Sequence, residues 1–120
     1  MTENELLQKT IQTIETVGGY SAFGTDISKD EIAENLSFFI FNSKGAIKKA
    51  DTPNQYLRDF DLFFITREDA EIDEFALILA LQKRGLRFRR TEYDYGKIKN
   101  TEVEAKMTTF NFHRALVIRE

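Results

Sequence analysis

Residues 56–66 read YLRDFDLFFIT, and this stretch decides the fold class. Phe60, Leu62 and Phe64 recur at every second position, so they share one side of an extended chain. Such alternation predicts an antiparallel strand that packs one face on a hydrophobic core.

The other side of this strand changes character along its length. It begins with Asp59 and Asp61 and ends with Phe63 and Ile65. A polar start indicates a face turned to water, whereas an apolar end predicts a further contact. That contact would be made either by neighbouring strands or by another subunit.

Three other stretches have strand character: residues 36–41, residues 86–89 and a long final stretch over about 103–118. The first is an aromatic and branched run, which is typical of a buried strand. In the second, Leu86 and Phe88 are expected to point inward, with Arg87 and Arg89 outward. Turn-forming residues follow the first of these strands. A polar segment over 93–100 is expected to reverse the direction of the chain.

Three segments have helical character. Thr2 and Glu5 have the spacing of a capping box at the start of the first helix, which ends at Gly18-Gly19. A second capping-box pair, Ser28 and Glu31, predicts a short helix over 29–35. The third helix is expected to begin near Asp69, because acidic residues crowd its start and basic residues its end.

The order of these segments predicts an α+β fold, α-β-β-α-β-β, with an antiparallel sheet of about four strands and helices packed on one face. The apolar stripe of the third helix would be Ile72, Phe75, Ala76 and Leu79, widened by Ile78 and Leu81. We therefore expect Phe60, Leu62, Phe75 and Leu79 to be buried together. With 120 residues, the chain is expected to form a single domain, 1–120.

Composition narrows the function classes. The chain has no cysteine, which excludes disulfides, thiol nucleophiles and cysteine-based metal sites. No apolar run approaches the length of a membrane span, so no membrane partner is expected. The net charge is −3, yet residues 1–80 carry seven basic and fifteen acidic side chains, and residues 81–120 carry ten basic and five acidic ones. An acidic first part and a basic last part favour docking on copies of the same chain or on a charged partner. A surface with charges of both signs also simply keeps a protein soluble.

The residues that could perform catalysis form no recognisable set. The single histidine, His113, has no nucleophile or carboxylate in a local catalytic motif. The acids near the third helix are explained by its dipole, and no phosphate-binding glycine loop is present. We therefore expect no enzyme activity, no cofactor and no metal.

Basic residues gather at the end of the third helix and in the strand after it: Lys83, Arg84, Arg87, Arg89 and Arg90. A dedicated or sequence-specific nucleic-acid binder is not expected at this overall charge. Arg87, Arg89 and Arg90 instead form one side of a candidate subunit or partner interface. The acidic counterparts would be Asp59 and Asp61, or the group Glu71, Asp73 and Glu74.

The layout of the chain resembles that of the tail terminator proteins of long-tailed bacteriophages and prophages, also called minor capsid or tail completion proteins. The resemblance rests on SFFIF at 37–41, FDLFFI at 60–65, LQKRGLRF at 81–88 and MTTFNFHR at 107–114. It covers nearly the whole chain, in layout more than in specific motifs.

The resemblance implies a virion structural protein that is assembled in the host cytoplasm. Members of the family are ring-forming subunits, typically hexameric, that cap the finished tail tube and meet head or neck proteins. The expected partners are therefore the chain itself, tail-tube proteins and head or neck proteins. A small non-enzymatic α+β module that binds or inhibits another protein is the alternative, and an enzyme is the third reading.

Overall fold

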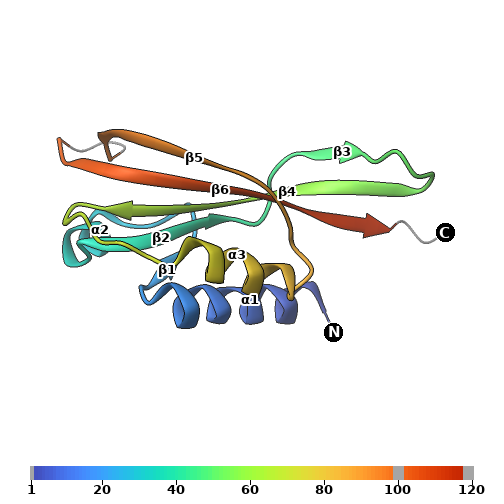
Figure 1. Cartoon of the computed structure of the whole chain (residues 1–120), viewed down its shortest axis with the longest axis horizontal. Coiled ribbons are helices and arrows are strands. Elements are labelled where there is room, and N and C mark those ends of the chain that lie inside the picture. Colours follow the sequence, from blue (N-terminus) through green and yellow to red (C-terminus); the bar gives the residue numbers. More distant parts are fainter. Residues whose placement is uncertain (1, 99–101, 118–120) are drawn as a thin grey trace.

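The computed structural model describes residues 2–98 and 102–117, which fold into a curved sheet with two helices beneath it (Figure 1). The elements in chain order are α1 (Glu3–Gly18), β1 (Ala22–Phe23), α2 (Lys29–Glu34), β2 (Ser37–Asn42), β3 (Ile47–Lys49), β4 (Gln55–Thr66), α3 (Glu74–Gln82), β5 (Arg87–Lys97) and β6 (Glu104–Val117). The α+β class predicted from the sequence is confirmed.

Within the described residues, the sheet has six strands rather than the predicted four or so. Its order is β1-β2-β4-β6-β5, and β3 pairs with the first part of β4. The β1–β2 pair is parallel and the other pairs are antiparallel, so the sheet is mixed. The two strands absent from the sequence prediction are β1 and β3, with two and three residues. Strands this short contain no measurable alternation, which is why periodicity misses them.

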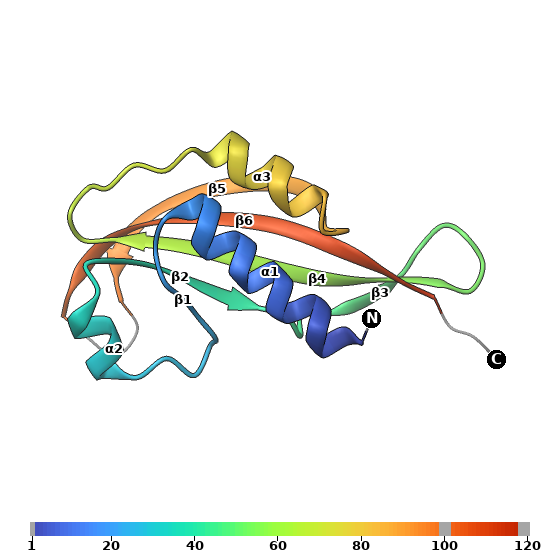
Figure 2. The ribbon, with the colours of Figure 1, turned by 90° about the horizontal axis from the view of Figure 1, so that it is seen from below.

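Strand β4 is the centre of the sheet. It pairs with β6 along its whole length, from Gln55 opposite Val117 to Thr66 opposite Lys106. The predicted alternation is confirmed, because Phe60, Leu62 and Phe64 are all buried on the face that α1 and α3 cover. Figures 1 and 2 show these two helices side by side on that face.

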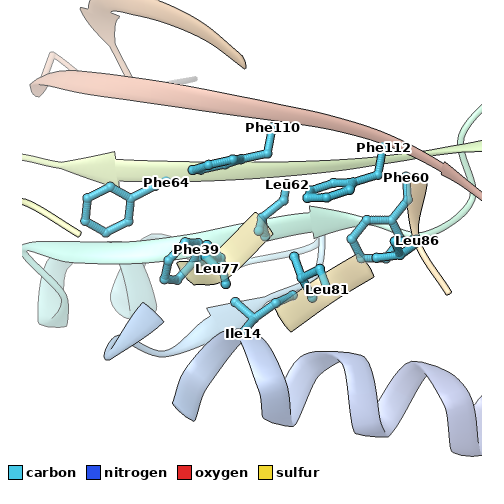
Figure 3. Packing of buried hydrophobic residues seen from close by; sticks show 10 residues of the cluster. All are labelled: Ile14, Phe39, Phe60, Leu62, Phe64, Leu77, Leu81, Leu86, Phe110 and Phe112. Atoms are coloured by element: carbon cyan, nitrogen blue, oxygen red, sulfur yellow. The ribbon is translucent and has the colours of Figure 1, made fainter. Parts of the chain in front are cut away.

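The main core lies between this face and the two helices (Figure 3). Its buried members come from α1, α3 and four strands or their flanks: Ile14, Phe39, Phe60, Leu62, Phe64, Leu77, Leu81, Leu86, Phe110 and Phe112. Aromatic pairs connect neighbouring strands, with ring centroids 4.9 Å apart for Phe39 and Phe64 and 5.6 Å apart for Phe88 and Phe112. Phenylalanines are five of the ten buried members of this core.

The prediction for the third helix is wrong in two respects. The helix begins at Glu74, after the Asp73 N-cap, and not near Asp69. Its buried residues are Leu77 and Leu81, whereas Phe75 is 71% exposed and Leu79 is 47% exposed. The predicted burial of Phe75 and Leu79 is therefore overturned. Residues 75–81 are all apolar, so no polar position marks the outer side of the helix and periodicity cannot select the inner one.

The opposite face of the sheet has a smaller core of its own. Ile32 of α2 packs there with Phe38, Ile65, Ile98 and Ala105. The short helix α2 therefore serves this face, while α1 and α3 serve the other. The contact expected at the apolar end of β4 is made within the chain, by neighbouring strands and α2.

The last strands also differ from the prediction. Residues 93–97, expected in a polar reversal, belong to β5, and the loop after it includes residues outside the described part. The expected end of the final strand, Ile118, also lies outside the described residues. At the other end of the sheet, the β3–β4 hairpin and the end of β6 extend beyond the helices (Figure 2). Within the described residues, no helix has the length and apolarity needed to cross a membrane.

Candidate interaction surface

A β-bulge positions the three predicted arginines. Arg87 is paired with His113 and Arg90 with Asn111, and the bulge between Phe88 and Arg90 leaves Arg89 as the extra residue. Simple alternation would place Arg90 on the opposite face from Arg87. The extra residue restores Arg90 to the same face, so all three arginines stand on the side of the sheet away from α1 and α3.

The predicted aspartates lie on the same face, two strands away. Asp59 is opposite His113, and Asp61 is opposite Asn111. Asp59 Oδ1 is 3.8 Å from Arg89 Nη1, and Asn111 Nδ2 donates a hydrogen bond of 2.6 Å to Asp61 Oδ1. The structure therefore brings the first acidic group and the arginines together within one molecule. We call this surface the charged face; it consists of Asp59, Asp61, Arg87, Arg89, Arg90, Asn111 and His113.

Three polar atoms of the charged face are buried and make no hydrogen bond within the described chain: Asp59 Oδ1, Asn111 Oδ1 and His113 Nδ1. The 3.8 Å contact of Asp59 with Arg89 is an ion pair, too long for a hydrogen bond. Buried polar atoms are nearly always paired in folded proteins. The chain already encloses these three atoms, so the charged face contains buried polar groups whose hydrogen bonds the described residues do not complete.

Sequence reasoning did not place His113 and Asn111 on this surface. Burial lowers the pKa of His113 below its usual 6.5, and the cations Arg89, Arg87 and Lys48 lower it further, against the opposing effect of Asp59. The imidazole is therefore neutral at pH 7. Only the strand register could have grouped these residues, because His113 and Asn111 are about fifty positions from the aspartates.

The second acidic group lies elsewhere, before and at the start of α3. Asp73 accepts a hydrogen bond from the Ala76 backbone N–H at 3.0 Å, which caps the helix. Glu74 accepts a hydrogen bond of 2.6 Å from the Tyr93 hydroxyl. Two of the three predicted acids thus have structural roles within the chain, and the exposed Glu71 is the one without a hydrogen bond or ion pair to the rest of the described chain.

The helical layer carries an exposed apolar surface that the sequence prediction had assigned to the core. Phe75 and Leu79 of α3 are 71% and 47% exposed, and Val17 of α1 is 37% exposed. Leu79 and Val17 line a shallow groove between the two helices. We call Phe75, Leu79 and Val17 the α3 patch.

A groove of about 590 Å³ lies on the face opposite the α3 patch, next to the smaller core. Its lining includes Ile40, Phe63, Ile65 and Met107 of the sheet, and Tyr95 of β5. The described lining is mostly apolar, and no set of catalytic groups converges among these described residues. Among residues 2–98 and 102–117, no three histidine, aspartate or glutamate side chains gather as a possible metal site. The groove can thus hold apolar groups of a ligand or partner.

Comparison with models of known protein families gives no match, and neither does comparison with curated protein sequences.

Proposed function

We propose that this chain is a structural subunit of a bacteriophage or prophage virion, a tail terminator or closely related head–tail joining protein. It assembles with copies of itself into a ring that caps the tail tube. The layout of helices and strands, read with the aromatic strand segments of the sequence, is what links it to this class. The proposal requires surfaces that a lone subunit leaves uncovered.

The outer side of α3 is the observation that carries the proposal. Residues 75–81 are apolar on all sides of the helix, and such a helix is normally buried on all sides. Here only Leu77 and Leu81 are fully buried, and Phe75 is 71% exposed. A neighbouring subunit seated on the α3 patch would remove this apolar surface from water.

The charges support a directional contact. The charged face presents Arg87 and Arg90 to solvent, and the exposed Glu71 lies in the segment between β4 and α3. Different parts of the surface thus have opposite sign. A head-to-tail contact between unlike surfaces generates a ring when the rotation between subunits closes.

The double variant Phe75→Gln/Leu79→Gln tests the proposal. Both side chains are exposed and glutamine is a good helix former, so the monomer is expected to fold normally. Wild-type protein should form rings in sedimentation velocity and negative-stain images, and the variant should not. Leu36→Gln is the matched control, because Leu36 is 53% exposed and lies outside the α3 patch.

Two results would count against the proposal. One is a wild-type protein that remains monomeric at its highest soluble concentration and also on isolated tail tubes. The other is ring formation unchanged in the double variant, which would remove the α3 patch as the interface. Genes for tail-tube, portal or tape-measure proteins next to the gene for this chain would support the assignment independently.

The second candidate is a small protein-binding or inhibitor module, and the 590 Å³ groove favours it. Its apolar lining can receive side chains from an unrelated protein, and this use needs no ring. Mass in solution and on isolated tail tubes separates the two candidates, because a binding module remains monomeric in both settings.

A further inference from the structure

A group of basic side chains surrounds a cavity of about 290 Å³ beneath the N-terminal half of α1. The basic residues in its lining are Lys44, Arg58, Arg84 and Arg114. They come from the loop after β2, from β4, from the end of α3 and from β6. The cavity lies on the helix-covered side of the sheet, so it is separate from the charged face.

Two of these arginines are direct neighbours across the sheet. Arg58 of β4 is in register with Arg114 of β6, and both stand on the face that carries Phe60 and Phe112. Like charges directly opposite each other on antiparallel strands repel and destabilise the pair. Folding this arrangement therefore has a cost that a bound negative charge would offset.

The protein supplies little of that negative charge itself. Among the described residues, Glu3 is the one carboxylate in the lining, and its Oε1 is 3.3 Å from Arg114 Nη2. Arg84 Nε donates to the Thr13 hydroxyl at 3.0 Å. Arg58 Nε is buried and has no acceptor among the described residues. In the part of the chain that the structure describes, the pocket lining therefore has four cations and one anion, although the net charge of the chain is −3.

We infer that this cavity, the basic pocket, binds a small oxyanion, either a carboxylate or a phosphate group. Guanidinium groups bind both in the same way, by parallel N–H donors directed at two oxygens. The side chains of Phe60 and Leu86 also line the pocket, and both are buried. Apolar walls limit water and strengthen a charge-assisted hydrogen bond. The inference does not depend on ring assembly.

Titration with inorganic phosphate and with acetate, each against chloride at matched ionic strength, tests this site. The expected result is an anion-specific rise in the melting temperature and a shift of the Arg58 Nε–H signal in NMR spectra. The anion that binds more tightly shows whether the pocket prefers a phosphate group or a carboxylate. Arg58→Gln should weaken binding at least tenfold and should unfold at no lower temperature than wild type in chloride, because the repulsion with Arg114 is gone.

Arg87→Gln is the matched control, since it removes the same charge from an exposed position outside the pocket. It should leave the response to both anions unchanged. Arg84→Gln is the second test variant, at an exposed position that tolerates substitution, in case Arg58→Gln does not fold. No response to either anion beyond that to chloride would overturn the inference, and so would equal responses in wild type, Arg58→Gln and Arg84→Gln.

Discussion

Phe112 and Phe75 are the same side chain in opposite surroundings. Phe112 is completely buried between the sheet and the helices, and Phe75 is 71% exposed on α3. Phe112→Ala should lower the free energy of unfolding by about 3–5 kcal/mol, the usual cost of an aromatic truncation in a core. Phe75→Ala should change it by less than about 0.5 kcal/mol in the dilute monomer, as for other surface substitutions.

Urea denaturation of the two variants at low protein concentration measures this difference. Both replace phenylalanine with alanine, so each is a control for the chemistry of the other. A loss above about 1 kcal/mol for Phe75→Ala in the monomer would contradict the exposure seen here.

His113 should make the stability depend on pH. Its pKa in the folded chain lies below the usual 6.5, because of burial and the nearby cations Arg89, Arg87 and Lys48. The unfolded chain therefore takes up a proton first as the pH falls, and this destabilises the folded state. The folded state keeps its full stability with respect to His113 above about pH 6.5, and it loses stability as the pH falls toward the folded-state pKa.

His113→Gln removes this titration. The variant should match wild type closely at pH 7.5 and should lose less stability than wild type between pH 7 and pH 5. Thermal denaturation across this range measures the difference between the two proteins, in which the carboxylates common to both cancel. Parallel curves for the two proteins would show that the folded environment leaves the His113 pKa unchanged.

At the level of elements, the start of α3 depends on one carboxylate. The Asp73 side chain accepts from the Ala76 backbone N–H at 3.0 Å. Asp73→Ala should cost about 1 kcal/mol, the typical value of an N-cap. Asp73→Asn should cost much less, because an amide oxygen can accept the same hydrogen bond. Chemical denaturation distinguishes them, and equal losses would mean that the charge of Asp73 matters rather than its hydrogen bond.

The sequence predicts an element well where apolar and polar residues alternate clearly over many positions, as in β4, and poorly where they do not, as in the polar second half of β5. β4 has twelve residues, and its two faces were assigned correctly. α3 has nine residues and an apolar run on every side, so its inner face depends on the sheet beneath it. Leu81 belongs to the widened stripe that the sequence predicts, whereas the burial of Leu77 becomes evident only once the sheet is placed.

The charged face was predictable as a set of residue types but not as an arrangement. Composition indicated that Arg87, Arg89 and Arg90 belong together. Their common face depends on a bulge of one residue, and the approach of Asp59 depends on β6 lying between the two strands. Both are consequences of long-range pairing, which a local pattern does not contain.

At the scale of the whole molecule, we expect assembly of the proposed ring to depend on the charge of the charged face. Arg87 is exposed on the charged face and makes no hydrogen bond or ion pair to other described residues, whereas Arg89 already meets Asp59. Arg87→Glu should therefore weaken assembly without disturbing a contact inside the chain. Like charges at an interface can cost several kcal/mol, which is enough to prevent ring formation.

Sedimentation velocity of wild type and Arg87→Glu at low and high salt tests this expectation. Lys9→Glu reverses a charge on the exposed side of α1 and is the control. Wild-type rings should weaken as salt rises, because the Debye length falls to about 3 Å at 1 M. If Arg87→Glu forms rings as readily as Lys9→Glu, the charged face is not the subunit interface.

The pairing of β4 with β6 has a consequence for how the chain is made. The partners are 62 positions apart where Gln55 meets Val117 and 40 apart where Thr66 meets Lys106. Contacts so distant along the sequence slow folding, because a long loop must close before they form. During synthesis β4 emerges well before its partner, so one edge of β4 remains unpaired until β6 follows. A nascent chain stalled after α3 should therefore be sensitive to protease and should bind chaperones, and release of β6 should end both.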